Sequence, residues 1–272
     1  MKLQILKYSL LTLFVTAKLS IAANVCDKIA NEPIIKINKP EVLSRVAELD
    51  LNTPQKEKFI EIQRTYIKNQ HSVNKEILNI KAQMNQLIIP DTLDEKQLSH
   101  LLFQLKQHWM ASQTQTIMTR HQLYNILKEP QQDKYKHLQQ EERAFIRLSI
   151  QCPEKVAQIR NQIDPDPLHH LNELNLLPKQ QAKILLMAKA VQIKDRRAYM
   201  MFDDSVMSAN EMDKKIVQSP KDIPIKQLQE YIEQQTNVLL DIQKRRIVAY
   251  HAIYHLLDDK QKNQFITLLK AQ

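Results

Sequence analysis

The sequence predicts an all-α protein made of long helices, and three observations lead to this prediction. The chain of 272 residues contains no glycine, the residue that normally supplies positive-φ turns and β-bulges. Alternating runs rich in Val, Ile and Thr, which are typical of strands, are missing from the sequence. Apolar residues instead recur at seven-residue intervals, most clearly from Phe59 to Leu87. We therefore expect long antiparallel helical hairpins.

The first 22 residues have the features of a secretory signal peptide. Lys2 and Lys7 give a basic start, residues 8–16 form an apolar stretch, and Ser20 to Ala22 offer a cleavage site of small residues. This stretch is too short to cross a bilayer alone, and no other segment approaches the ~20 apolar residues that a spanning helix needs. We predict export to a bacterial periplasm and no integral membrane segment.

Two sets of helices follow, joined by proline-containing turns. In the first half we expect a short helix over 41–49, long helices over 54–88 and 94–127, and a shorter one over 129–150. In the second half we expect helices over 178–218, 225–257 and 259–269. Cys152-Pro153 and residues 164–167 mark the junction between the halves. Because one hairpin of this length buries little surface, each half needs a partner.

One short element occurs four times and supports a duplication. Tyr124 to Tyr135 and Tyr254 to Phe265 both read Tyr-x-x-Leu-x-x-x-Gln-x-x-x-aromatic, 130 residues apart. A second pair of Leu-x-x-x-Gln elements lies 125 residues apart. Because the two kinds of element occur in the same order in each half, we predict one repeat over 23–150 and another over 151–272. The eight motif residues, to which we assign a structural role, are Leu51, Gln55, Leu127, Gln131, Leu176, Gln180, Leu257 and Gln261.

The spacing within this element is that of a helix start. In a capping box, an N-cap side chain and a Gln three residues later bond each other's backbone amides. Asn52 with Gln55, and Asp258 with Gln261, fit this pattern. The other two copies lack a capping side chain and keep only the Gln. This is why we interpret the motif as structural.

The two cysteines also follow the repeat. Cys26 and Cys152 lie 126 residues apart, and similar residues follow each of them. In an oxidising compartment, a pair of cysteines most simply forms a disulfide, which here would join equivalent positions of the two halves. Free thiols or intermolecular links are the alternative.

These elements together resemble the Spy/CpxP family of periplasmic proteins, whose hallmark is the motif LTxxQ. The resemblance is carried by the four Leu-x-x-x-Gln elements, the hairpin tip from Ile89 to Asp94, the run Tyr124 to Leu127 and the export signal. None of the four copies has Thr directly after the leucine. The family forms thin all-α cradles from two antiparallel subunits that act as ATP-independent chaperones. The resemblance therefore implies two Spy-like repeats in one chain, packed as a pseudo-dimeric cradle.

Residues that could carry chemistry are few. We find no nucleophile with a base, and a phosphate loop rich in glycine is impossible here, so we expect no enzyme and no cofactor. His251 and His255 would share a helix face, as metal-binding pairs do. No carboxylate or cysteine at helical spacing completes a set, so we favour surface or interface histidines over a metal site.

One segment of the second half is a candidate surface for unfolded proteins. Methionine is flexible and polarisable, which suits a surface that accepts many shapes, and arginines beside it can bind acidic side chains. Core packing on an amphipathic helix is the alternative for each of these residues. The segment comprises Arg196, Arg197, Tyr199, Met200, Met201 and Phe202.

Two classes of function fit the sequence. The leading one is a stress-response chaperone that holds unfolded or misfolded proteins on a concave apolar and basic surface. The alternative is a periplasmic stress or metal-responsive regulator, which would modulate a sensor kinase as CpxP-like proteins do, or bind zinc. The formal charge of +9 falls to about +6 without residues 1–22, which suits acidic clients or an anionic membrane. Nucleic acid is not an expected partner, because export and the lack of a basic cluster interleaved with aromatic residues argue against it.

Overall fold

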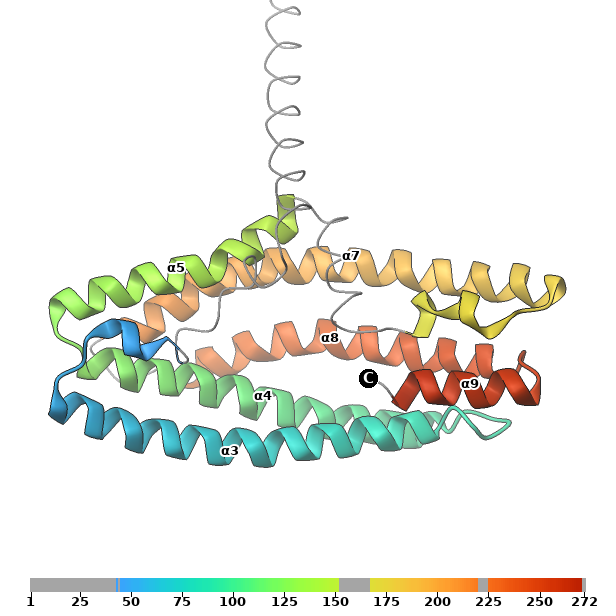
Figure 1. Cartoon of the computed structure of the whole chain (residues 1–272), viewed down its shortest axis with the longest axis horizontal. Coiled ribbons are helices and arrows are strands. Elements are labelled where there is room, and N and C mark those ends of the chain that lie inside the picture. The colour runs from blue at the N-terminus through green and yellow to red at the C-terminus, as the bar shows by residue number, and fades with distance from the viewer. Residues whose placement is uncertain (1–42, 44, 152–166, 220–224, 271–272) are drawn as a thin grey trace, which may run out of the picture.

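The computed structural model describes residues 43, 45–151, 167–219 and 225–270, and this part of the chain is helical without strands, as predicted (Figure 1). Residues 1–22, Cys26 and Cys152 lie outside it. The elements are η2 (Val46–Leu49), α3 (Thr53–Gln86), α4 (Glu95–Ile126), α5 (Glu129–Gln151), η3 (Pro167–His169), η4 (Leu171–Leu174), α7 (Pro178–Val217), α8 (Ile225–Tyr254) and α9 (Asp259–Lys270).

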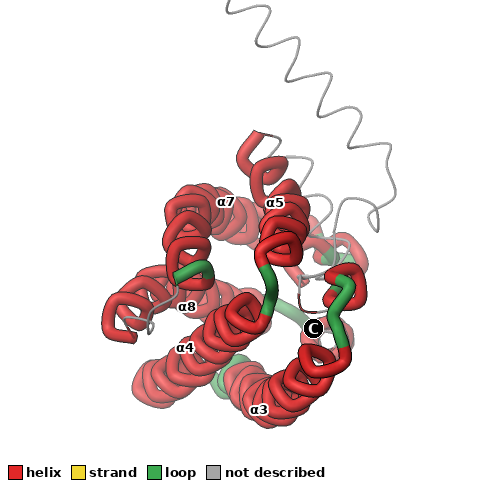
Figure 2. Tube along the Cα trace, turned by 90° about the vertical axis from the view of Figure 1, so that its left-hand side faces the viewer, coloured by secondary structure: helices red, strands yellow, loops and turns green. Residues whose placement is uncertain are grey.

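Two long antiparallel hairpins form the body of the molecule. Helix α3 packs along α4, and α7 packs along α8 (Figure 1). Helix α4 also packs against α8, which runs in the opposite direction. Seen from one end, the long helices follow one another along a curve in the order α3, α4, α8, α7 and α5 (Figure 2). Among the described residues, no helix combines the length and apolarity needed to cross a membrane.

The helix starts agree with the capping prediction. Asn52 accepts a hydrogen bond from the Gln55 amide at 3.0 Å, and the Gln55 side chain accepts one from the Asn52 amide at 3.0 Å. Asp258 and Gln261 form the same reciprocal pair, with both bonds at 2.9 Å. These two capping boxes satisfy backbone amides that have no partner within their helices.

The predicted helix over 41–49 differs in the structure. Its described part is 3-10 rather than α-helical, at residue 43 and over the turn η2, which ends at Asp50 with φ of 50°. The turn η4 in the second half ends in the same way, at Asn175 with φ of 50°. These are the only left-handed residues in the described ranges. Asp and Asn tolerate this conformation better than other non-glycine residues, so a chain without glycine can still make both turns.

The buried residues form two clusters, and each cluster draws on both halves of the chain. One joins η2, the end of α4 and α5 to the last turn of α7 and the first turns of α8, including Leu123, Tyr135, Val217 and Leu228. The other joins the end of α3 and the start of α4 to η3, η4, the start of α7, the end of α8 and α9. Each half therefore supplies one part of both cores.

Candidate functional site

The motif glutamines of the first half bind each other. Gln55 Nε2 donates to Gln131 Oε1 at 2.8 Å, and Gln131 Nε2 donates back to Gln55 Oε1 at 3.1 Å. Each amide also donates to a backbone carbonyl, that of Ile126 at 2.7 Å and that of Asp50 at 3.0 Å. This cyclic pair joins the start of α3 to the start of α5 across 76 residues of sequence.

The second half contains the same arrangement. Gln180 Nε2 donates to Gln261 Oε1 at 3.0 Å and to the Leu256 carbonyl at 2.7 Å. Gln261 Nε2 donates to Gln180 Oε1 at 3.2 Å and to the Asn175 carbonyl at 3.2 Å. The left-handed residues Asp50 and Asn175 thus present equivalent carbonyls to equivalent glutamines.

Each glutamine also caps its own helix. In the two copies without a capping side chain, the glutamine oxygens accept from the backbone amides of Lys128 and Leu177, both at 2.9 Å. One side chain therefore serves a helix start and a contact between elements, which requires both the donor and the acceptor of a primary amide. Of the motif leucines, three are buried and Leu176 is half-buried.

An ion pair adds to the first of these junctions. Lys134 Nζ donates to Asp50 Oδ2 at 2.8 Å. This hydrogen bond lowers the pKa of the exposed Asp50 carboxyl below its ordinary value.

The aromatic part of the motif differs between the halves. The rings of Tyr124 and Tyr135 meet edge to face, with centroids 5.5 Å apart. In the second half, Phe265 makes the corresponding contact with Tyr250, at 6.0 Å. Tyr254, which matches Tyr124 in the sequence, is instead half-buried. The tyrosine that contacts the second aromatic residue therefore lies one helical turn earlier in the second half. Alignment of Tyr124 with Tyr254 in the sequence does not predict equivalent packing.

The histidines bind the turns between the long helices. Both His251 and His255 donate through Nε2 to the carbonyl of Pro90, at 2.9 Å and 2.8 Å, because a carbonyl can only accept. His121, 130 residues before His251, makes the same kind of contact with the Ser219 carbonyl at 3.1 Å. Each half thus holds the hairpin turn of the other. In the described part of the chain, no group of three or more His, Cys, Asp or Glu residues is placed to hold a metal ion.

A buried carboxylate joins α7 to α8 near the middle of the second hairpin. Asp195, on α7, accepts from the Nε atoms of Arg245 at 3.1 Å and Arg246 at 2.9 Å, both on α8. The first hairpin has a neutral network at the corresponding place, where Gln70 and Ser112 bond each other.

Little of the segment predicted to bind clients has a described side chain. All six residues lie in α7, but only Arg197 among them has a side chain in the described set, and it is exposed. The side chains of Arg196, Tyr199, Met200, Met201 and Phe202 lie outside that set.

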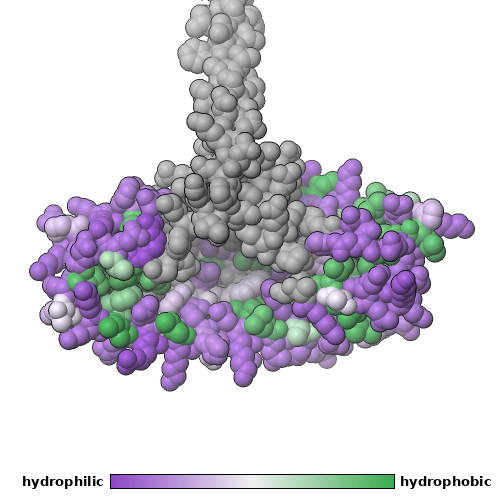
Figure 3. Space-filling view, viewed as in Figure 1, coloured by the Kyte–Doolittle hydropathy of each residue, from purple (hydrophilic) through white to green (hydrophobic). Residues whose placement is uncertain are grey.

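Exposed apolar residues on other parts of the surface were not predicted. On α3, Ile60, Ile67 and Leu78 are 51%, 57% and 62% exposed. On α7, Leu186 and Ile193 are 71% and 47% exposed. Figure 3 shows small apolar patches distributed among polar side chains on the face that it displays. Their spacing of seven or eleven residues could have indicated a second apolar row, on the side of the helix opposite the core.

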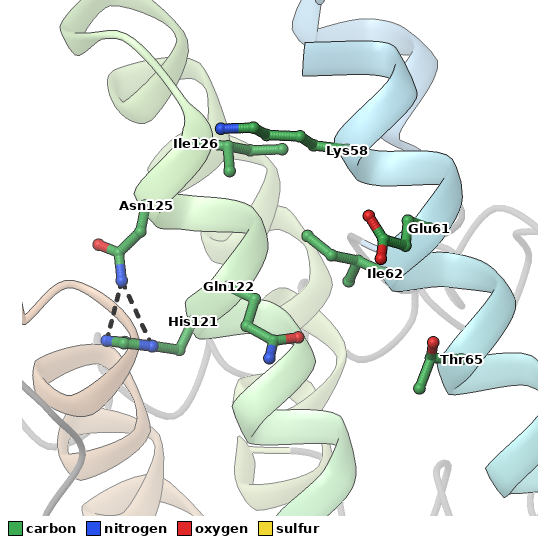
Figure 4. A pocket seen from close by; sticks show the side chains of 8 residues that line it. All are labelled: Lys58, Glu61, Ile62, Thr65, His121, Gln122, Asn125 and Ile126. Carbon is green, nitrogen blue, oxygen red and sulfur yellow. Dashed lines mark hydrogen bonds between the residues drawn. The ribbon is translucent and has the colours of Figure 1, made fainter. Parts of the chain in front are cut away.

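An open pocket of about 570 Å³ lies between α3 and α4, close to the first motif junction (Figure 4). The α3 side carries Lys58 and Glu61, whereas the α4 side carries His121, whose Nδ1 accepts a hydrogen bond from the Asn125 amide at 3.3 Å. The lining consists of Lys58, Glu61, Ile62, Thr65, His121, Gln122, Asn125 and Ile126. Both charge signs and apolar groups therefore line this pocket.

Comparison of the chain with protein families, with curated proteins and with solved structures finds no match.

Proposed function

We propose that this protein is an ATP-independent periplasmic chaperone that holds unfolded proteins, built as a tandem relative of the Spy/CpxP family. The observation that carries the proposal is the row of exposed apolar residues on α3. Ile60, Ile67 and Leu78 stand on one side of the helix, since their spacings of seven and eleven residues are close to whole turns.

Charged side chains surround this row. Lys56, Arg64 and Lys75 are exposed on the same side of α3, and Glu57 and Glu61 are exposed on one flank. Unfolded chains present apolar and charged groups together, so a row that offers both can bind many of them weakly. A long helix covered on one side only gives such chains an extended contact.

The internal pairing of the two halves supports the tandem reading. A fused antiparallel dimer would have equivalent contacts in its two halves and cores shared between them. This chain has equivalent glutamine pairs, equivalent contacts of His121 and His251 with the hairpin turns, and two cores to which both halves contribute. In this proposal the duplicated halves pack as a pseudo-dimer about the contact of α4 with α8.

Aggregation of an unrelated denatured protein without ATP, followed by light scattering, tests the function. We expect suppression near equal molar amounts, and a loss of at least several-fold when Ile60, Ile67 and Leu78 are all replaced by Ser. The matched control replaces three exposed apolar residues elsewhere, Phe103, Ile225 and Val248, by Ser. Equal losses in both variants, or no suppression by the unaltered chain, would contradict the proposal.

A further inference from the structure

The outer face of the first half of α7 differs from the rest of the surface. Leu186 and Ile193 lie two turns apart and are exposed, and the exposed Ala182 and Ala190 lie between and beside them. On the other side of the helix, Ile184 and Ala188 face the core. This part of α7 runs along one edge of the molecule, at the upper right in Figure 1.

Among the described side chains of residues 178–197, every exposed charged group is a cation. Five cations are exposed over residues 178–197, namely Lys179, Lys183, Lys189, Lys194 and Arg197. Asp195 is the one acidic residue of that stretch, and it is buried against Arg245 and Arg246. By helical geometry, Lys183 and Lys194 lie on one side of Leu186 and Lys189 lies on the other.

The equivalent stretch of α3 provides a contrast within the same chain. Residues 53–72 carry the exposed acidic side chains Glu57 and Glu61 among their cations. The two helices hold matching places in their hairpins, so the fold itself does not require the uniform charge of α7.

We propose that this face of α7 docks the protein on the surface of a bilayer that contains anionic lipids. A helix that lies on a membrane places apolar side chains at the centre of its outer face and cations on both sides, where their heads reach the lipid phosphates. A peptide helix would need a groove to bury its own apolar side, whereas Leu186 and Ile193 stand exposed on the outer side of one helix. A flat anionic surface fits an uncovered helix at the edge of the molecule.

Cosedimentation with phosphatidylcholine vesicles, with and without phosphatidylglycerol, tests the docking. The protein is used without residues 1–22, because the apolar stretch over 8–16 would itself bind lipid. We expect binding only when phosphatidylglycerol is present, and weaker binding as salt is added.

Two variants of α7 examine the apolar and the charged parts separately. Leu186→Ser with Ile193→Ser, and Lys183→Glu with Lys189→Glu, should each weaken binding by more than about tenfold. All four side chains are exposed, so melting midpoints should stay unchanged. The matched control, Ile60→Ser with Ile67→Ser on α3, should bind vesicles as the unaltered chain does.

Three results would overturn the docking proposal. They are the absence of binding to vesicles with phosphatidylglycerol, equal losses in the α3 and α7 variants, and binding to soluble polyglutamate but not to vesicles. The last result would identify an acidic protein as the partner. None of them bears on the proposed chaperone function, because aggregation assays contain no lipid and depend on α3.

Discussion

At the scale of single residues, the glutamine of the motif does more than cap a helix. In the first half, Gln55 and Gln131 together bond two helix starts, two distant carbonyls and each other. A carboxylate in either place would lose the donor, and a leucine would lose both functions. This dual requirement explains why Gln recurs in all four copies while the residue at the cap position varies.

The pairing of Gln55 with Gln131 leads to a measurable coupling. Gln55→Ala and Gln131→Ala should each lower the free energy of unfolding by about 1–3 kcal/mol, because each leaves polar partners unsatisfied. The double variant should lose less than the sum of the two, with a coupling on the order of 1 kcal/mol. Denaturant unfolding of the unaltered chain, the two single variants and the double variant measures this coupling.

Gln107→Ala, at an exposed position in α4, is the control and should change the free energy of unfolding by less than about 0.5 kcal/mol. Strict additivity would show that the two amides do not act as a pair.

Part of this junction could be predicted from the sequence and part could not. Capping depends on residues three apart, so the boxes at Asn52 and Asp258 were predictable from local spacing. The bond between Gln55 and Gln131 depends on how helices pack across 76 residues, which no local pattern contains. For the same reason, the sequence match of Tyr254 with Tyr124 does not predict that Tyr250, one turn earlier, contacts Phe265.

At the scale of elements, helices were predictable and their connections less so. Apolar periodicity and prolines gave the long helices to within a few residues, because packing of one face fixes a helix over many turns. The turns η2 and η4 are too short to show a periodic pattern of apolar residues. Each ends at a left-handed residue, and without glycine the sequence contains no clear signal for that conformation.

The left-handed residue Asn175 can be tested directly. Asn175→Ala should lower the free energy of unfolding by about 1–2 kcal/mol, because a Cβ without a polar group disfavours positive φ. Asn175→Gly should cost less than the alanine variant, since glycine adopts this conformation freely. Thermal unfolding of both variants gives the comparison, with Asn79→Ala on the exposed side of α3 as the control. A glycine variant less stable than the alanine variant would contradict the argument.

At the scale of the whole molecule, both buried clusters draw on residues from both halves of the chain. Leu228 of the second half is fully buried among residues of the first, and Leu98 of the first half is buried in the cluster that contains Phe265. The sequence indicated that a lone hairpin buries too little surface, but not which helix ends would meet. Such long-range contacts follow from the three-dimensional arrangement of the hairpins, so they required the structure.

The last prediction follows from these shared cores. Residues 23–151 alone would expose the part of one cluster that Val217 and Leu228 cover, and residues 167–272 alone would expose the surface covered by Leu98. Because buried apolar area is the main favourable term in folding, we expect neither half alone to unfold cooperatively as a monomer.

Mixed in equal amounts, the two halves should associate one to one and regain the helical circular dichroism of the intact chain. Size-exclusion chromatography and thermal melts would show this. Leu228→Ala should weaken this association markedly, whereas Val248→Ala, at an exposed position on the same helix, should not. A single half that melts cooperatively as a monomer, at the midpoint of the intact chain, would show that its core is complete without the other.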